Sequence, residues 1–189
     1  MENCVECGSK LEDEELNRYV CKSCYDKLIM LEKETIRKLI TFEPPDHIID
    51  SIYIGGERSA IDLAYLEGNG FSNIVITAFL CEKPFIDKGI SYHVIDIDDH
   101  PSEDIKGYFK QIYQYIKNCK GNVLVHCVSG ISRSVSFVIA YLMLDKGWDY
   151  DKCLGYIRSK RSCAHPNSGF QKQLRVFKEE LDLKDKTTK

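Results

Sequence analysis

The feature that most constrains this chain is a strand, a polar loop and a helix in immediate succession. Val123 to Val125 is a short apolar run typical of a buried strand, and Ser134 to Leu144 is an apolar stretch of helical character. The loop between them, residues 126–133, therefore lies at the amino terminus of a helix. We expect an anion site there, because the first N–H groups of a helix lack internal partners and the helix dipole adds positive potential.

Cys127 is the candidate nucleophile in this loop. At a helix amino terminus its pKa should fall below that of a free cysteine, so that the thiol is ionised near neutral pH. Arg133 follows after five residues, which is enough chain to curl around an oxyanion and bring a planar guanidinium against it. The alternative is that Cys127 is simply a buried thiol, since free cysteines are often core residues.

The loop sequence HCVSGISRS resembles the active-site loop of cysteine-dependent protein phosphatases, and most closely that of the dual-specificity branch. The resemblance implies that Cys127 attacks phosphorus, Arg133 holds the phosphoryl oxygens, and the Ser134 hydroxyl helps to expel the thiolate in the second step. His126 is interpreted as a hydrogen-bonded structural residue beside the site, without a role in proton transfer. The other residues expected to line the phosphate site with Arg133 are Val128, Ser129, Gly130, Ile131 and Ser132.

The same resemblance continues outside the loop. The segment from Ile52 to Gly56 resembles the LYLG opening of these domains, and Phe71 to Thr77 resembles their GITHILNV strand. The family's usual asparagine falls on Ile76, so a polar contact beneath the active site is missing or replaced. The segment from Arg161 to Leu174 resembles RP…PNxGFxxQL, with serine in place of the first proline. In that family the asparagine, here Asn167, steadies the phosphate loop.

A general acid is expected just after a further strand, Ser91 to Ile97. Cleavage of a phosphate ester needs an acid to protonate the leaving oxygen and then a base to activate water, and one carboxyl can do both. Matching the surrounding residues to the family's pattern assigns this role to Asp99, with Asp98 and then Asp96 as alternatives. The competing interpretation is that this acidic loop merely caps the helix that follows it.

From Ile48 to Leu183 the resemblance is nearly continuous and covers about three-quarters of the chain. It implies an α/β fold with a central sheet of four or five strands, helices on both faces, and the substrate at the carboxyl end of the strand before Cys127. We therefore expect a dual-specificity phosphatase domain over residues 47–183. A flexible, charged tail is expected over residues 184–189.

The amino-terminal segment has a different pattern. Two CxxC pairs, thirteen residues apart, supply the thiols of Cys4, Cys7, Cys21 and Cys24. Four thiolates on two tight turns are the ligand set of a closed, structural zinc site, and the pattern resembles a zinc ribbon. We expect a zinc module over residues 1–24 and a helical linker over 25–46. The alternative is a redox-active or disordered cysteine-rich arm.

Composition sets the remaining limits. With 189 residues, 43% hydrophobic and 29% charged, the chain can bury an ordinary core. A net charge of -3 gives no support for nucleic acid or an anionic membrane as a partner. Its longest near-apolar stretch is half the ~20 residues that a membrane span requires. The chain opens on acidic sequence rather than a signal-peptide pattern, and nine cysteines fit reduced thiols, so a cytoplasmic or nuclear location is expected.

These observations predict a protein phosphatase acting on phosphotyrosine and phosphoserine or phosphothreonine through a phosphocysteine intermediate, without a cofactor in the reaction. Two alternatives stay open. One is a phosphatase for a non-protein ester, such as a phosphoinositide, an RNA 5′-phosphate or a phosphoglucan. The other is a phosphoprotein-binding scaffold with little activity. Under each of these hypotheses, the zinc module is a candidate binding site for a protein partner.

Overall fold

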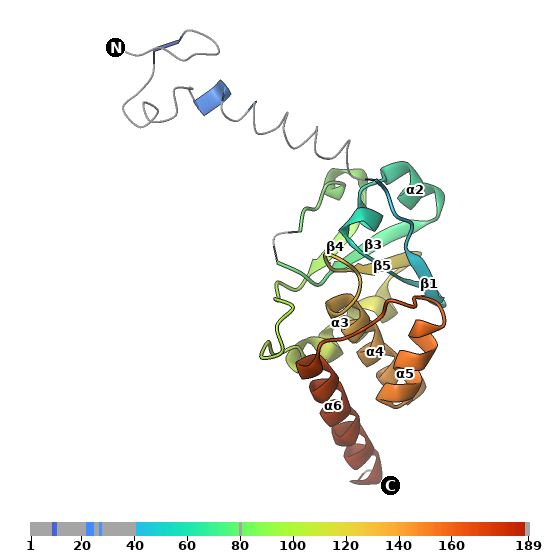
Figure 1. Ribbon diagram of the computed structural model, residues 1–189. Coiled ribbons are helices and arrows are strands. Elements are labelled where there is room, and N and C mark those ends of the chain that lie inside the picture. Colours follow the sequence, from blue (N-terminus) through green and yellow to red (C-terminus); the bar gives the residue numbers. More distant parts are fainter. Residues whose placement is uncertain (1–8, 11–21, 25–26, 28–40, 80, 188–189) are drawn as a thin grey trace. The chain divides into compact units, whose positions relative to one another are not determined.

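The computed structural model describes residues 9–10, 22–24, 27, 41–79 and 81–187. The chain divides into two units, Met1–Thr41 and Phe42–Lys189. The second unit carries the sheet and its helices (Figure 1). No helix in the described part of the chain combines the length and the apolar character needed to cross a lipid bilayer.

A mixed five-stranded sheet forms the centre of the second unit, as the sequence predicted. Its order is β1-β2-β5-β3-β4; β1 is antiparallel to β2, and the other neighbours are parallel. The strands are β1 (Asp46–Ile49), β2 (Ile52–Gly55), β3 (Phe71–Ile76), β4 (Ser91–Val94) and β5 (Asn122–His126). The middle strand, β5, is buried along most of its length, which explains its continuous apolar run.

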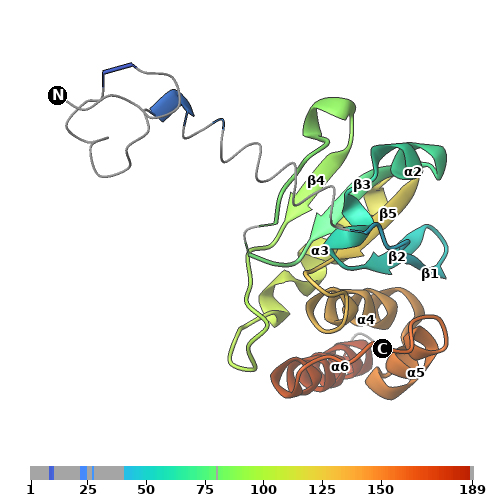
Figure 2. The ribbon, with the colours of Figure 1, turned by 45° about the horizontal axis from the view of Figure 1, so that its top comes forward.

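Helices cover both faces of this sheet, as expected. The helices are η2 (Glu57–Ala60), α2 (Leu63–Gly68), η3 (Ile86–Lys88), η4 (Lys106–Tyr108), α3 (Phe109–Asn118), α4 (Arg133–Lys146), α5 (Tyr150–Arg158) and α6 (Ser168–Thr187). The larger layer contains α3 to α6, whereas α2 lies on the opposite face (Figure 2). Side chains of β5 alternate between the two layers: Leu124 packs in the cluster with α2, and Val125 packs in the cluster with α4.

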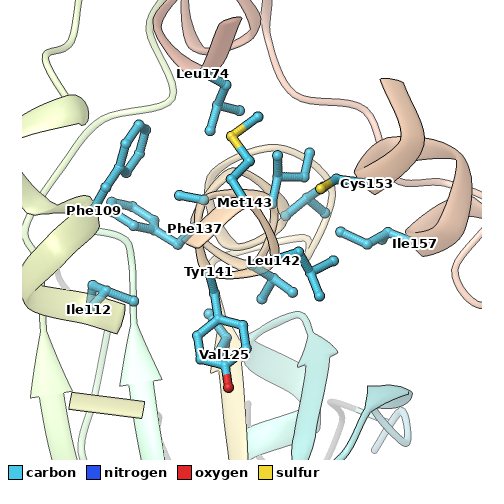
Figure 3. Close-up of a cluster of buried hydrophobic side chains, with 14 of the residues drawn as sticks. Phe109, Ile112, Val125, Phe137, Tyr141, Leu142, Met143, Cys153, Ile157 and Leu174 are labelled. Atoms are coloured by element: carbon cyan, nitrogen blue, oxygen red, sulfur yellow. The ribbon is translucent and has the colours of Figure 1, made fainter. Parts of the chain in front are cut away.

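Helix α4 is the centre of the larger layer. Every residue from Arg133 to Met143 is buried. A helix that is apolar on all sides has to be surrounded, and α4 packs against α3, α5, α6 and the sheet. Figure 3 looks along α4 and shows Phe109, Leu174, Cys153 and Val125 approaching it from four different elements. This packing fixes the start of α4, and with it the loop that precedes the helix.

Local capping explains where two of the helices begin. In the sequence, the segment from Ser59 to Glu67 has the pattern of a single helix. In the structure it forms two pieces, η2 and α2, because the Asp62 side chain accepts a hydrogen bond from Tyr65 N at 2.9 Å and starts a new helix. Helix α5 begins in the same way. There the Asp149 carboxylate accepts from Lys152 N at 2.8 Å.

The carboxyl-terminal helix is longer than the sequence analysis indicated. The domain was expected to end at residue 183, but α6 runs from Ser168 to Thr187. Its start is set by Asn167, whose side chain accepts a hydrogen bond from Phe170 N at 3.0 Å. The tail expected from residue 184 is therefore helical as far as Thr187. Apolar residues end at Leu183, but the next residues, Lys184, Asp185 and Lys186, do not interrupt a helix.

Candidate active site

The loop between β5 and α4 lies at the edge of the sheet where the parallel strands β2, β5 and β3 end. It is held to the end of β2 by a backbone hydrogen bond from Glu57 N to the Val128 carbonyl at 2.9 Å. Gly130 has a φ of 69°, and a Cβ there would lie 2.5 Å from the carbonyl oxygen of Gly55. Only glycine suits this position, since both the backbone angle and the close approach exclude a side chain. The loop is therefore tightly curled, as the sequence predicted.

Cys127 lies at the bottom of this loop and is fully buried. Its Sγ accepts a hydrogen bond from Gly130 N at 3.2 Å and lies 3.5 Å from the Ser134 hydroxyl oxygen. Burial raises the pKa of the Cys127 thiol, but hydrogen bonds from Ser134 and Gly130 and the charge of Arg133 outweigh it, so the pKa falls below its ordinary value. The arrangement favours a thiolate.

Arg133 is the first residue of α4, and 8% of it is exposed. Its Nη1 donates to the carbonyl oxygen of Ile97 at 3.1 Å, which fixes the guanidinium plane. Its Nε lies 3.7 Å from Asp99 Oδ2 and makes no hydrogen bond within the described part of the chain. A buried donor left unpaired in this way is costly, and a phosphoryl oxygen would satisfy it.

Asp99 faces the loop. Its Oδ1 accepts hydrogen bonds from the Ser132 hydroxyl at 2.6 Å and from Asn167 Nδ2 at 2.8 Å. All three candidate acids, Asp96, Asp98 and Asp99, are exposed, so exposure does not separate them. The hydrogen bonds to Ser132 and Asn167 attach Asp99 directly to the phosphate loop, and this geometry favours it over its two neighbours.

Asn167 connects three parts of the site. Besides its bond to Asp99, its backbone N–H donates to the Ser132 hydroxyl oxygen at 3.0 Å, and its side chain caps α6. The Ser132 hydroxyl thus donates to one partner and accepts from the other. Asn167 therefore lies beside the phosphate loop, where the family resemblance put it.

His126 ends β5 and is buried. Burial lowers its pKa to about 4, so the imidazole is neutral at physiological pH. Its Nδ1 lies 3.2 Å from the Cys127 carbonyl oxygen. The Thr77 hydroxyl donates to the His126 carbonyl oxygen at 3.0 Å, and Thr77 N donates to the same oxygen at 2.9 Å. Thr77 thus supplies a polar contact beneath the site, one residue after the position where Ile76 lacks it.

The sequence analysis did not assign a role to Arg161, which is 7% exposed. Its Nε donates to the Gly130 carbonyl at 2.7 Å and its Nη2 to the Ser129 carbonyl at 3.1 Å. Its Nη1 pairs with Asp46 Oδ2 on β1 at 2.6 Å. One buried guanidinium therefore ties the phosphate loop to the edge of the sheet. The only sequence signal was its place at the start of a segment resembling the family.

Two apolar residues of the loop face solvent. Val128 is 44% exposed and Ile131 37% exposed, whereas Ser132 and Ser134 are buried. The Ser134 hydroxyl therefore faces the sulfur and the Ser132 hydroxyl faces Asp99, whereas the exposed apolar side chains form the rim. No lysine or arginine lies among residues 128–132 to bind a second phosphate group.

The predicted zinc ligands Cys4, Cys7 and Cys21 lie outside the described residues, and the described Cys24 is half-buried. A search of the described residues finds no group of three or more His, Cys, Asp or Glu side chains that could hold a metal ion. Among the thiols outside the phosphate loop, burial raises the pKa of Cys81 to about 11 and that of Cys153 to about 12.

Comparison with known proteins agrees with this geometry. Residues 52–180 match the family model described as "Dual specificity phosphatase, catalytic domain". Human protein phosphatase Slingshot homolog 1 is 34% identical over 155 residues, which cover 80% of this chain but 15% of that protein. Human dual specificity protein phosphatase 22 is 36% identical over 133 residues, which cover 69% of this chain and 71% of that protein.

Solved structures give the same result. The human tyrosine phosphatase-like serine/threonine/tyrosine-interacting protein superposes with a TM-score of 0.69 at 33% identity, covering 74% of this chain and 97% of that one. Human DUSP28 superposes with a TM-score of 0.70 at 26% identity, covering 75% and 99%. On the family match and the identity to these relatives, the chain belongs to the dual-specificity phosphatase catalytic-domain family.

Proposed function

We propose that this protein hydrolyses phosphotyrosine and phosphoserine or phosphothreonine in protein substrates through a phosphocysteine intermediate. The observation that carries the proposal is the pair of hydrogen bonds to Cys127 Sγ, from Gly130 N and the Ser134 hydroxyl, with the Arg133 guanidinium beside them. A buried thiol of lowered pKa next to a buried guanidinium suits attack on a phosphate dianion.

In the first step the Cys127 thiolate attacks phosphorus, an S–P bond forms, and the P–O bond to the leaving group breaks. The Arg133 guanidinium and the loop N–H groups hold the three non-bridging oxygens through this change. Asp99, in its protonated form, gives its proton to the leaving oxygen, which departs as a neutral hydroxyl. The products of the step are the dephosphorylated side chain and phosphocysteine.

In the second step water attacks the phosphocysteine. The Asp99 carboxylate, now ionised, takes a proton from the water, and the S–P bond breaks as the new P–O bond forms. The Ser134 hydroxyl donates to the departing sulfur, so that Cys127 leaves as a thiolate. Inorganic phosphate is released and both side chains return to their starting forms. The chain's own N–H groups and Arg133 supply the positive potential, so the proposed chemistry uses no metal.

Protein substrates are favoured by the rim of the loop. The exposed Val128 and Ile131 suit the apolar ring of phosphotyrosine or the flanking side chains of a phosphopeptide. A phosphoinositide or RNA end carries further phosphate groups, which a loop without added cations does not favour. The less favoured substrate classes are therefore phosphoinositides, RNA 5′-phosphates and phosphoglucans.

A binding role without catalysis is the other candidate. One structural relative is the human tyrosine phosphatase-like serine/threonine/tyrosine-interacting protein, and its name makes a binding role the alternative for this chain. This chain keeps both Cys127 and Arg133, the nucleophile and the oxyanion-binding cation. Retaining both favours an enzyme over a binder.

Hydrolysis of p-nitrophenyl phosphate by the wild type and by Cys127→Ser tests the proposal. We expect turnover by the wild type and none by the variant, which should still bind phosphopeptides. Equal, low rates for both proteins would favour the binding role. A panel of phosphopeptides, phosphoinositides and 5′-phosphorylated RNA then separates the substrate classes, and a pull-down with Cys127→Ser captures the physiological substrate.

The helical linker expected over residues 25–46 does not reach residue 46, because residues 41–45 are not helical and Asp46 belongs to β1. For the amino-terminal segment we propose a structural zinc in a module over residues 1–24, joined by a helical linker over residues 25–40 to the phosphatase domain. The support is the sequence pattern of Cys4, Cys7, Cys21 and Cys24. Elemental analysis should find about one zinc per chain in the wild type and none in Cys4→Ser/Cys7→Ser. Zinc in both proteins, or in neither, would contradict the assignment. We also propose that this module binds a protein partner. The proposed location of the protein is the cytoplasm or the nucleus.

A further inference from the structure

The segment that carries Asp99, residues 96–105 and called here the acid loop, is attached to one side chain of α6. Gln173 Nε2 donates to the Glu103 carbonyl oxygen at 2.7 Å. Gln173 Oε1 accepts from Ile105 N at 2.9 Å and from Lys106 N at 3.1 Å. A single half-buried amide therefore makes three hydrogen bonds to the backbone at the end of the acid loop.

We infer that Gln173 is a positioning residue for the general acid: it holds the acid loop so that Asp99 is already beside the phosphate site before substrate arrives. The inference rests on the proposed function, because it requires Asp99 to be the acid. Gln173 does not touch the substrate. It acts through the backbone that leads from Glu103 back to Asp99.

Two further contacts attach the acid loop and the residue that follows it to α6. Gly169 lies directly against Pro101, since a Cβ at Gly169 would fall 1.8 Å from the Pro101 carbonyl oxygen. Beyond the loop, Lys106 Nζ pairs with Glu180 on α6 at 2.5 Å. Together with the bond from Asn167 to Asp99, these contacts attach the acid loop to α6 from its first half to its end.

This attachment has a catalytic meaning. A general acid must lie within about 2.6–3.2 Å of the oxygen it protonates, and a misplacement of about 1 Å can cost on the order of 10²-fold in rate. A loop that is already bonded to a rigid helix does not have to close on the substrate. An amide is suited to this task because it offers a donor and an acceptor together, whereas leucine offers neither and glutamate loses the donor.

The test compares an activated ester with a poor one. p-Nitrophenolate leaves readily without a proton, whereas phenolate needs one, so the ratio between the rates on the two esters reports on the acid. The rates compared are kcat/KM values, which cover only the steps up to transfer of the phosphoryl group to Cys127 and so exclude the later step in which Asp99 acts as base. We expect Gln173→Leu to lower kcat/KM on phenyl phosphate about tenfold or more, with kcat/KM on p-nitrophenyl phosphate within about twofold of the wild type. Gln173→Glu keeps the acceptor, so its rate on phenyl phosphate should lie between those of the wild type and Gln173→Leu.

A matched control lies on the same helix. Arg175 makes an exposed ion pair with Asp151 of α5, away from the acid loop. Arg175→Gln should leave both rates unchanged. Thermal unfolding of all variants shows which of them remain folded at the assay temperature, and Gln173→Glu serves if Gln173→Leu does not fold.

Asp99→Asn separates failure of this inference from failure of the proposed function. If Asp99→Asn lowers the two rates equally, the assignment of the acid itself is wrong. If it selectively lowers the phenyl phosphate rate but the folded Gln173 variants lower both rates equally, or neither, the role of Gln173 is wrong and the proposed function stands. Adding Gln173→Leu to Asp99→Asn should cause no further selective loss, because the two act as one unit.

Discussion

Arg161 Nη2 donates a hydrogen bond to the carbonyl oxygen of Ser129 at 3.1 Å, and this bond orients the peptide group that faces the nucleophile. The N–H of the same peptide group belongs to Gly130 and donates to Cys127 Sγ at 3.2 Å. In a planar trans peptide the C=O and N–H point in opposite directions. By holding the carbonyl on one side, Arg161 directs the amide toward the sulfur on the other.

Arg161→Lys should therefore raise the pKa of the Cys127 thiol and slow catalysis. A lysine carries the charge, but its donors radiate from one nitrogen atom and do not reproduce the planar fork by which three nitrogens of Arg161 reach two carbonyls and the Asp46 carboxylate. We expect about tenfold lower kcat and a loss of about 1–3 kcal/mol in the free energy of unfolding. The rate of iodoacetate alkylation of Cys127 against pH gives the thiol pKa directly. If the variant is less stable but its alkylation rate depends on pH as in the wild type, Arg161 stabilises the fold without lowering the pKa of Cys127.

The phosphate loop could be predicted from the sequence because its determinants are local. Val123 to Val125 is a short apolar run and Ser134 to Leu144 is a longer one, and the cysteine, the glycine and the arginine lie between them. Such a pattern fixes a strand, a turn and a helix amino terminus without knowledge of the rest of the chain. The family resemblance then supplied the order of the remaining strands and helices.

The supports of the site could not be predicted in the same way. Arg161 binds backbone carbonyls about thirty residues earlier in the chain, and Gln173 binds backbone groups about seventy residues earlier. Backbone groups are present at every residue, so no pattern of side chains indicates which of them a distant side chain will meet. The division between η2 and α2 could not be predicted either. Asp62 caps a helix there, inside a stretch of sequence that has the pattern of one continuous helix.

His126 should make the stability of the domain depend on pH. Because burial lowers its pKa to about 4, the folded protein binds fewer protons than the unfolded chain between about pH 4 and the ordinary histidine pKa of 6.5. Above pH 6.5 the contribution of His126 to the free energy of unfolding does not change with pH. As pH falls from 6.5 to about 4, the free energy of unfolding decreases by up to about 3 kcal/mol. Urea unfolding of wild type and His126→Gln from pH 4 to 7 measures the difference. Parallel curves for the two proteins would show that His126 does not titrate in this range.

Gly169→Ala should displace the acid loop. The added methyl group would overlap the Pro101 carbonyl, so that either α6 or the loop has to move. We expect a destabilisation of about 1–3 kcal/mol and a selective loss of rate on phenyl phosphate. Gly155→Ala on α5 is the matched control, because nothing lies within 4 Å of a Cβ there. That variant should be neutral or stabilised by about 0.5–1 kcal/mol. Equal behaviour of the two variants would contradict the close packing at Pro101.

The central claim is that the Cys127 sulfur accepts the phosphoryl group. Rapid quenching of the enzyme with a denaturant near neutral pH during turnover of p-nitrophenyl phosphate, followed by mass spectrometry of the peptide that contains Cys127, tests it directly. The account predicts one PO₃ group on this cysteine in the wild type and none on the same peptide of Cys127→Ser, which should also be inactive. Turnover by Cys127→Ser at the wild-type rate, with no modified cysteine in either protein, would contradict it.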